Sequence, residues 1–434
     1  MNAVLDSFFG LRENGTTVRQ EVLAGATTFV TMAYIIFVNP AILAEAGMDK
    51  GAVFVATCLA AALGSLLMGL LANYPIAVAP GMGLNAFFTY GVVLGLGHSW
   101  EAALGAVFIS GILFLVLSIL PVRAWIINAI PRSQRLAISA GLGFFLGLIA
   151  LRNAGIVVDH PATLVGIGDL ASMPVVLAIM CFLGIGALDA RGVPGAILLG
   201  MGGITALGVA LGVSPFEGVV SLPPSMAPTF MAMDIGAALE LTMISVVLAF
   251  LFVDIFDTAG TLIGVSHRAG LLDEHGNLPR MNRAFIADSS ATMVGAALGT
   301  SPVTSYMESA AGVKAGGRTG LTAIVAAILF LACIFLAPAA GTIQNYATAP
   351  ALLFVACVMA RGVAEFDWDD VTDFVPGIVT VLTMPLTFSI ANGIGFGLIT
   401  FAALKLLSGR HKEVSVGLLI VCGLFVAKFI WLEG

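Results

Sequence analysis

Two aspartates, Asp254 and Asp257, stand three residues apart in the apolar stretch FVDIFDTAGTLIG, residues 252–264. Together with Thr261 they follow helical spacing, which places all three on one face of a helix. A carboxylate at the depth of a bilayer costs at least about 2.5–3.5 kcal/mol unless it is neutralised or faces a cavity. We interpret Asp257, which a threonine and a glycine follow, as a group that binds a solute. For Asp254 two interpretations stay open, a brace to a neighbouring helix and a second functional group.

The same letters occur in two kinds of nucleotide-dependent enzyme, and neither fits the rest of the chain. DTAG is found in small GTPases and D-x-x-G-T in ion-pumping ATPases, but the chain has no G-x-x-x-x-G-K-[ST] and no hydrophilic stretch long enough for a nucleotide domain. An intramembrane enzyme acting on lipid is the alternative from another class. It would need a nucleophile with a base, or metal ligands, at depth. The histidines fall in loops or termini and the cysteines stand singly, so we expect no enzyme, no metal and no cofactor: His98, His160, His267, His275, His411, Cys58, Cys181, Cys333, Cys357 and Cys422.

Two other apolar segments, residues 75–91 and 299–317, are interrupted by proline and glycine, notably at Pro80 and Pro302. A proline removes a backbone donor and lipid offers no replacement partner, so such backbone must line a protein-enclosed cavity. Half-helices that start there point free N–H groups at whatever lies between them. Asn85 and Glu308 follow the two breaks and are placed to meet a hydrogen-bonding solute. Phe87, and Phe88 beside it, can stack on a flat ring or belong to the core.

The composition requires a membrane protein. The 434 residues are 59% hydrophobic and 10% charged, and the mean hydropathy is +1.06, so almost every window of about twenty residues is apolar enough to span a bilayer. About fourteen segments follow, with 414–432 left over as an expected interfacial or peripheral helix. They lie near 22–43, 51–73, 75–96, 101–120, 135–153, 174–190, 193–213, 237–265, 284–299, 300–317, 319–343, 347–362, 373–390 and 391–408.

The basic residues orient these spans. With a cytosolic N-terminus only Lys50 and Arg152 fall in outside loops, as the positive-inside rule favours. The inside positions hold Arg12, Arg19, Arg123, Arg132, Arg135, Arg191, Arg268, Arg280, Arg283, Lys314, Arg318, Arg361, Lys405, Arg410 and Lys412. We therefore expect a multi-pass protein of the inner, or plasma, membrane.

Two pairs of segments look like distant copies. APGMGLNAFFTYGVV matches TSPVTSYMESAAGVK, and LDARGVPGAILLG matches IANGIGFGLITFA near the end of each half. The chain therefore divides into two sets of seven spans. Because seven is odd, the second set enters the membrane inverted, which is the plan of many secondary transporters.

These motifs together resemble the nucleobase:cation symporters of the xanthine/uracil permease superfamily, and specifically their AzgA-like adenine/guanine/hypoxanthine branch. The resemblance is carried by AGATTFVTMAYIIFVNP at 24–40, APGMGLNAFF at 79–88, FDTAGTLIG at 256–264, GTSPVTSYMESAAGV at 299–313 and MPLTFSIANGIGFG at 384–397. It implies an all-α fold of 7+7 inverted repeats with short strands in spans three and ten. It also implies elevator-type movement of a core domain against a gate domain.

The implied domains have the following bounds. An N-terminal arm covers 1–21, the core domain covers 22–120 and 237–343, the gate domain covers 121–236 and 344–412, and a hydrophobic segment covers 413–434. The gate domain is also where we expect a homodimer to form.

The resemblance also assigns residues. The family's acids of spans eight and ten fall on Asp257 and Glu308, and the AzgA-like asparagine of span three falls on Asn85. Thr261 stands where the uracil and xanthine branches carry histidine, which argues against those substrates. The predicted substrate site also includes Thr28, Phe87, Ser305 and Tyr306, with Asp254 and Asp288 as supporting residues.

The chemistry agrees with a purine substrate. A purine base is flat, nearly neutral and edged with donors and acceptors, so carboxylates can accept from it while backbone amides donate to it. We expect a proton as coupling ion, carried by Glu308 or Asp257, with sodium as the alternative, and no nucleic-acid partner. A transporter of inorganic anions, or of pyrimidine or xanthine, on the same fold is the alternative function. Carboxylates in the site argue against an anion.

Overall fold

The computed structural model describes residues 2–120, 131–271 and 278–431. Arg123 and His275, which belong to predicted loops, lie outside these ranges. Among the described residues, nine helical segments are long and apolar enough to cross a membrane, and four shorter apolar helices accompany them. The chain is thus a multi-pass membrane protein built almost entirely of helices.

The first half begins with a short arm and contains the first broken span. Its elements are α1 (Asn2–Phe9), α2 (Val18–Met32), α3 (Ile35–Glu45), α4 (Lys50–Leu67), η1 (Met68–Ala72), β1 (Val78–Pro80), α5 (Met82–Ala86), η2 (Phe87–Val93), α6 (Trp100–Ile119), α8 (Arg132–Asn153), β2 (Val157–His160), β3 (Leu164–Ile167), α9 (Met173–Ala190) and α10 (Ala196–Ala210).

The second half contains the other broken span and ends in an additional helix. Its elements are α11 (Ile235–Ala238), α12 (Leu241–Ala269), α13 (Met281–Leu298), β4 (Val303–Ser305), α14 (Ser309–Lys314), α15 (Gly320–Ala332), η3 (Cys333–Leu336), α16 (Ala337–Thr342), α17 (Asn345–Met359), η4 (Ala360–Glu365), α18 (Val371–Leu386), α19 (Ile390–Leu407), η5 (His411–Glu413) and α20 (Val416–Trp431).

The two breaks meet at the centre of the fold as an antiparallel pair of strands. β1 pairs with β4 in the register Val78 with Ser305 and Pro80 with Val303. The amide of Gly81 continues the pairing by donating to the carbonyl of Pro302 at 2.9 Å. Each strand thereby supplies hydrogen-bond partners that lipid could not. The short strands expected in spans three and ten are present.

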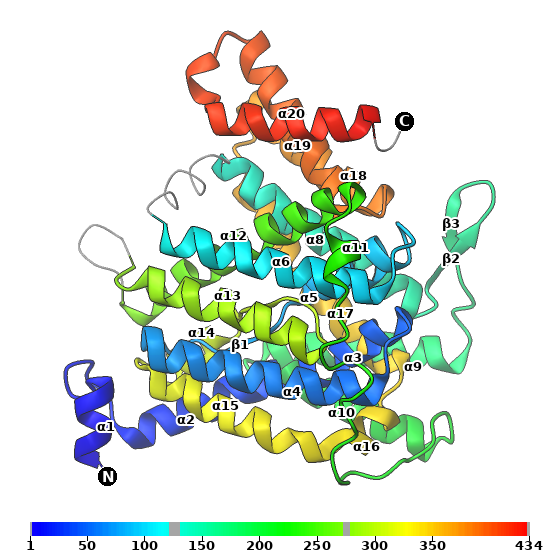
Figure 1. Cartoon of the computed structure of the whole chain (residues 1–434). Helices are drawn as coiled ribbons and strands as arrows, with labels where there is room; N and C mark the ends of the chain where they lie inside the picture. Colours follow the sequence, from blue (N-terminus) through cyan, green and yellow to red (C-terminus); the bar gives the residue numbers. More distant parts are fainter. Residues whose placement is uncertain (1, 121–130, 272–277, 432–434) are drawn as a thin grey trace.

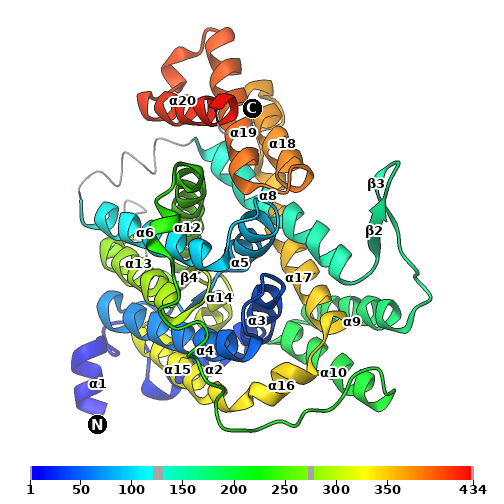
Figure 2. The same cartoon turned by 45° about the vertical axis from the view of Figure 1, so that its right-hand side comes forward.

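The helices form two packed groups, which Figures 1 and 2 show from two directions. One group contains α2, α4 and α15 together with α6, α12 and α13. The other contains α8, α17, α18 and α19 together with α9 and α10. The groups touch at several places, among them α3 with α17, α2 with α10, α5 with α8, and α12 with α8 and α19. The predicted core and gate domains stay a prediction.

Two features at the edges of the fold were not fully anticipated. β2 and β3 form an antiparallel hairpin that projects from the helices in Figure 1, and the sequence had suggested only a loop there. α20 packs on α19, with the rings of Phe396 and Phe429 stacked at 4.8 Å. Its position at the membrane surface or periphery stays a prediction.

Candidate functional site

The two aspartates of α12 lie in different surroundings although they are neighbours on one helix face. The side chain of Asp254 is buried, with 1% of it exposed. Asp257, one turn further along, is partly exposed. Asp257 is therefore the more accessible of the two carboxylates in this conformation.

Asp254 and Asp288 belong to a buried network that fixes strand β4. Thr292 Oγ1 lies 3.1 Å from Asp254 Oδ2 and 2.8 Å from the carbonyl oxygen of Val303. Asp288 accepts from Thr258 and from Ser305, each at 2.7 Å. Buried carboxylates of this kind need such donors because they are withdrawn from water. The network joins α12, α13 and β4. The supporting role of both aspartates stays a prediction.

Glu308 stands directly before α14 and is held by a residue of span one. Tyr34, which lies where α2 ends and before α3 begins, donates its hydroxyl to Glu308 Oε1 at 2.6 Å. Tyr34 itself is completely buried, whereas Glu308 is partly exposed. None of the ion pairs between described residues includes Glu308 or Asp257.

Asn85 is placed by a second residue of span one. Its Nδ2 donates to Asn39 Oδ1 at 3.0 Å, and its Oδ1 has no hydrogen-bond partner among the described residues. Asn39 in turn bonds to Thr57, Thr300 and Ser301. One short segment, residues 34–39, therefore contacts the predicted substrate residues of both broken spans.

The structure places three further predicted site residues in supporting positions. Ser305 points its hydroxyl to Asp288, and the hydroxyl of Tyr306 donates to the carbonyl of Pro80. Thr28 is buried against α14, where a Cβ on Gly312 would meet Thr28 Oγ1 at 2.0 Å. The first contact joins β4 to α13, the second joins the residue after β4 to β1, and the third packs α2 on α14.

Phe87 and Thr261 are both buried. Phe87 is 1% exposed and its ring packs 4.9 Å from that of Phe250 on α12. This packing favours the core interpretation of Phe87 over the stacking one. Thr261 is 2% exposed, one helical turn beyond Asp257 on the same α12 face.

The sequence interpretation missed Tyr34 and Asn39. Both lie in the stretch AYIIFVNP, and a polar side chain within so apolar a segment was a signal of the same kind as that given by Asp257. They were overlooked because a tyrosine and an asparagine beside a proline also occur as ordinary packing residues.

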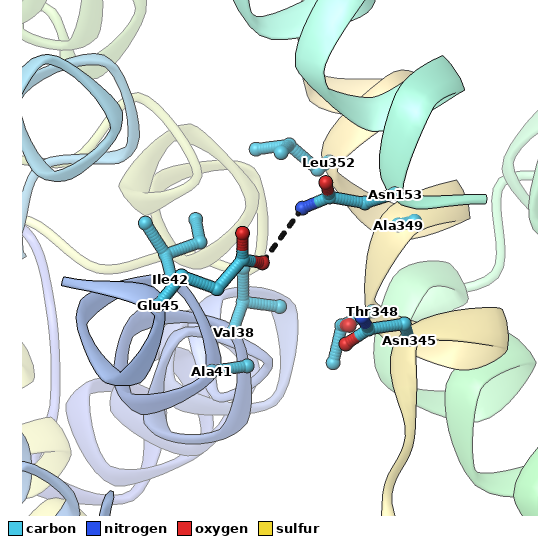
Figure 3. Close-up of a pocket in the computed structure, with 9 residues that line it drawn as sticks. All are labelled: Val38, Ala41, Ile42, Glu45, Asn153, Asn345, Thr348, Ala349 and Leu352. Atoms are coloured by element: carbon cyan, nitrogen blue, oxygen red, sulfur yellow. Dashed lines mark hydrogen bonds between the residues drawn. The ribbon is translucent and has the colours of Figure 1, made fainter. Parts of the chain in front are cut away.

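A separate small pocket lies where the two helix groups meet, between α3 on one side and α8 and α17 on the other (Figure 3). Asn153 Nδ2 donates to Glu45 Oε1 at 3.0 Å and also lies 2.7 Å from the hydroxyl of Tyr90. This contact connects α8 of one group with α3 and η2 of the other.

Comparison with known proteins identifies the family. The profile described as "Permease family", of the xanthine/uracil type, matches residues 19–396. The adenine permease AdeP of Escherichia coli K12 is 46% identical over 430 residues, covering 99% of this chain and 97% of that protein. The guanine/hypoxanthine permease PbuG of Bacillus subtilis 168 is 44% identical over 444 residues, covering 99% and 100%.

A solved structure supports the architecture. The transmembrane domain of the cyanobacterial bicarbonate transporter BicA superposes with a TM-score of 0.64 at 15% identity, covering 88% of this chain and 97% of that chain. At this identity the likeness concerns the fold alone, the 7+7 inverted repeat expected from the sequence. The chain belongs to the xanthine/uracil permease family and is a transporter rather than an enzyme.

Proposed function

We propose that the protein imports purine nucleobases, namely adenine, guanine or hypoxanthine, by proton symport. The relatives named adenine permease and guanine/hypoxanthine permease support the substrate class, because their similarity covers nearly the whole chain. The observation that carries the proposal is the pair Asp257 and Glu308. They are partly exposed carboxylates beside the β1–β4 pair, and no described cation pairs with them.

Each group has a chemical role in this proposal. The carboxylates accept hydrogen bonds from the N–H groups of the base, and Asn85 contributes a third polar contact. Glu308 carries the coupling proton, because a carboxylate in a poorly hydrated site is tolerated in its charged form only when substrate or a proton compensates it. Asp254 and Asp288 keep β4 in place while the occupancy of the site changes.

The proposed movement follows from the two helix groups. The core domain, 22–120 with 237–343, carries the site and slides as an elevator against the gate domain, 121–236 with 344–412. We place the protein in the plasma membrane with a cytosolic N-terminus, on the basis of its loop charges. A homodimer would form through the gate domain.

Uptake by proteoliposomes tests the proposal. Labelled hypoxanthine, guanine and adenine should accumulate under an imposed inward proton gradient and not under a sodium gradient alone. Xanthine and uracil should compete weakly, and sulfate or bicarbonate should not compete. Failure of every purine to enter, or equal inhibition by bicarbonate, would overturn the substrate assignment. Accumulation driven by a sodium gradient would show that sodium, rather than the proton, is the coupling ion.

A further inference from the structure

The side-chain amide of Asn85 is completely buried, yet only half of it is paired. Its Nδ2 donates to Asn39 Oδ1, whereas Oδ1 has no partner among the described residues. A buried acceptor within the membrane is costly unless something donates to it. Asn85 therefore has one unmatched atom, and the identity of that atom decides what kind of group it can bind.

A chain of hydrogen bonds determines which atom is left over. The hydroxyl proton of Thr57 goes to the carbonyl oxygen of Val53, 2.7 Å away in the same helix. With its one proton so used, the Thr57 oxygen can only accept. The atom facing it at 2.8 Å must then be Asn39 Nδ2.

The remaining bonds follow in order. With its nitrogen toward Thr57, Asn39 directs its oxygen to Asn85 and to Ser301, whose hydroxyl lies 3.2 Å away. Asn85 must turn its nitrogen to that oxygen. Asn39 Nδ2 thus donates one N–H to Thr57 and the other to Thr300, each at 2.8 Å. Asn39 Oδ1 accepts from Asn85 and from Ser301, so the whole amide is paired. A fully satisfied amide cannot rotate without losing bonds, so it holds Asn85 in one orientation.

We infer that Asn39 is a positioning residue that makes Asn85 present an acceptor oxygen, so that the site recognises an N–H donor of the purine. This inference rests on the proposed function and deepens it. Segment 34–39 supports it geometrically, because the same segment holds Glu308 through Tyr34 and Asn85 through Asn39. Two acceptors, one from each broken span, then face the donor edges of the base.

Methylated bases test the inference because a methyl group removes one donor at a time. Hypoxanthine methylated at N1, N7 or N9 is used to compete with the uptake of labelled hypoxanthine. The factor by which each methyl group weakens the apparent affinity is the methylation penalty for that position. In the wild type at least one position should cost roughly tenfold or more in apparent affinity, as expected when a buried acceptor is left unmatched. In Asn39→Ala that penalty should fall to about twofold or less, although Asn39 does not touch the base.

Variants of Thr57 provide the matched control and a milder perturbation. Thr57→Ser keeps the hydroxyl and should show the wild-type pattern of penalties. Thr57→Val has nearly the same shape but no acceptor, so Asn39 can turn and the penalty should shrink as in Asn39→Ala. A ratio of affinities is unaffected by how much protein is folded, so poor yield of one variant does not obscure the result.

Three outcomes are decisive. A reduced penalty in Asn39→Ala and Thr57→Val, but not in Thr57→Ser, supports the inference. Wild-type penalties in both Asn39→Ala and Thr57→Val overturn it, as does a wild type indifferent to methylation at every position. If the wild type takes up no purine at all, the proposed function itself fails, which is a different result from transport with an unchanged pattern.

Discussion

At the scale of residues, Asp254 and Asp257 show how one helical turn separates two different surroundings. Asp254 bonds to Thr292 and is buried, whereas Asp257 is partly exposed. Placing either carboxylate within the membrane costs free energy unless a partner compensates its charge. The donors around Asp254 and Asp288 connect α12 and α13 with strand β4. Asp257 and Glu308 are partly exposed, and none of the ion pairs between described residues includes them.

Substitution by asparagine should therefore give opposite results at these two positions. Asp254→Asn should lower the free energy of unfolding by about 1–3 kcal/mol, if its amide nitrogen takes the place of Oδ2, the oxygen that faces Thr292 Oγ1 at 3.1 Å. Asp257→Asn should leave stability near that of the wild type and abolish base binding. Thermal shift in detergent, with and without guanine, measures both effects. The reverse pattern would assign the solute to Asp254.

Glu308→Gln separates binding from coupling. Glutamine keeps the size and one acceptor oxygen but cannot exchange a proton, so counterflow exchange of purine should persist while accumulation driven by a pH gradient fails. Glu240→Gln, at the exposed start of α12, is the matched control and should accumulate normally. Normal gradient-driven accumulation by Glu308→Gln would move the coupling proton elsewhere, with Asp257 the next residue to test.

At the scale of elements, the half-helix α14 depends on close packing against α2. A Cβ added to Gly312 would lie 2.6 Å from the carbonyl oxygen of Ala24, and 2.0 Å from Thr28 Oγ1. Backbone atoms at such a distance can move apart only by disturbing the packing of both helices, which costs stability. The position of α14, and with it that of Glu308, is therefore set by the absence of a side chain at one glycine.

Gly312→Ala should accordingly move α14 and impair both stability and transport. We expect a loss of about 1–3 kcal/mol in the free energy of unfolding and a raised apparent KM for purine. Gly264→Ala on α12, where a Cβ would meet nothing within 4 Å, is the control and should be neutral or slightly stabilising. Wild-type kinetics in Gly312→Ala would show that α14 does not position the site.

The ends of α18 and α19 are joined by a charged cluster that gives a pH dependence. Asp370 accepts from Thr372 Oγ1 at 2.7 Å and pairs with Arg410 and Lys405. The hydrogen bond from Thr372, and after it that from Arg410, hold the pKa of the Asp370 carboxyl well below its ordinary value. A depressed pKa in the folded state means that the stabilisation is present above the unfolded pKa, near about 4, and is lost as the pH falls.

Asp370→Asn should thus lower the melting temperature at pH 7, at a cost of about 1–2 kcal/mol. The difference from the wild type should shrink as the pH falls below about 4. Melting curves at stepped pH values measure it. Asp369→Asn, at the exposed neighbouring position, serves as control and should follow the wild type throughout. A difference in melting temperature between Asp370→Asn and the wild type that stays constant down to pH 3 would contradict the stabilising role of the ionised Asp370.

At the scale of the whole molecule, the two helix groups meet at the pocket of Figure 3, where Asn153 of α8 bonds to Glu45 of α3. If the core domain slides against the gate domain, this contact must break in each cycle. A link across it should hold the two domains in one relative position.

Cross-linking tests this movement. In a background with the exposed Cys357 replaced by serine, the double variant Glu45→Cys/Asn153→Cys should lose nearly all uptake on treatment with a short thiol-specific cross-linker. A reducible linker should restore uptake when it is cleaved. Each single variant should keep uptake under the same treatment. Undiminished uptake by the fully cross-linked protein would exclude movement at this boundary.

The sequence by itself determined the class of the protein, the two breaks and the presence of acids in the predicted spans eight and ten. It predicted about fourteen spans, whereas the described residues form nine helical segments long enough to cross a membrane and four shorter apolar helices. The class, the breaks and the acids follow from local rules. A bilayer fixes the length of an apolar segment, and a proline lacks the N–H that a helix interior needs. A carboxylate in lipid is costly, so its presence indicates a function or a partner. The comparisons with known proteins confirm the expected family and its inverted-repeat fold. The site residues stay predictions that the experiments above address.

Only the tertiary structure decided which side chains meet. Tyr34 reaches Glu308 across 274 positions of sequence, Asn39 reaches Asn85 across 46, and Phe87 packs on Phe250. No periodicity or motif specifies such pairs, because a polar group in an apolar span takes its role from whatever covers it after folding. For this reason the sequence marks Asp254 and Asp257 alike, while the folded chain buries Asp254 against Thr292 and leaves Asp257 partly exposed.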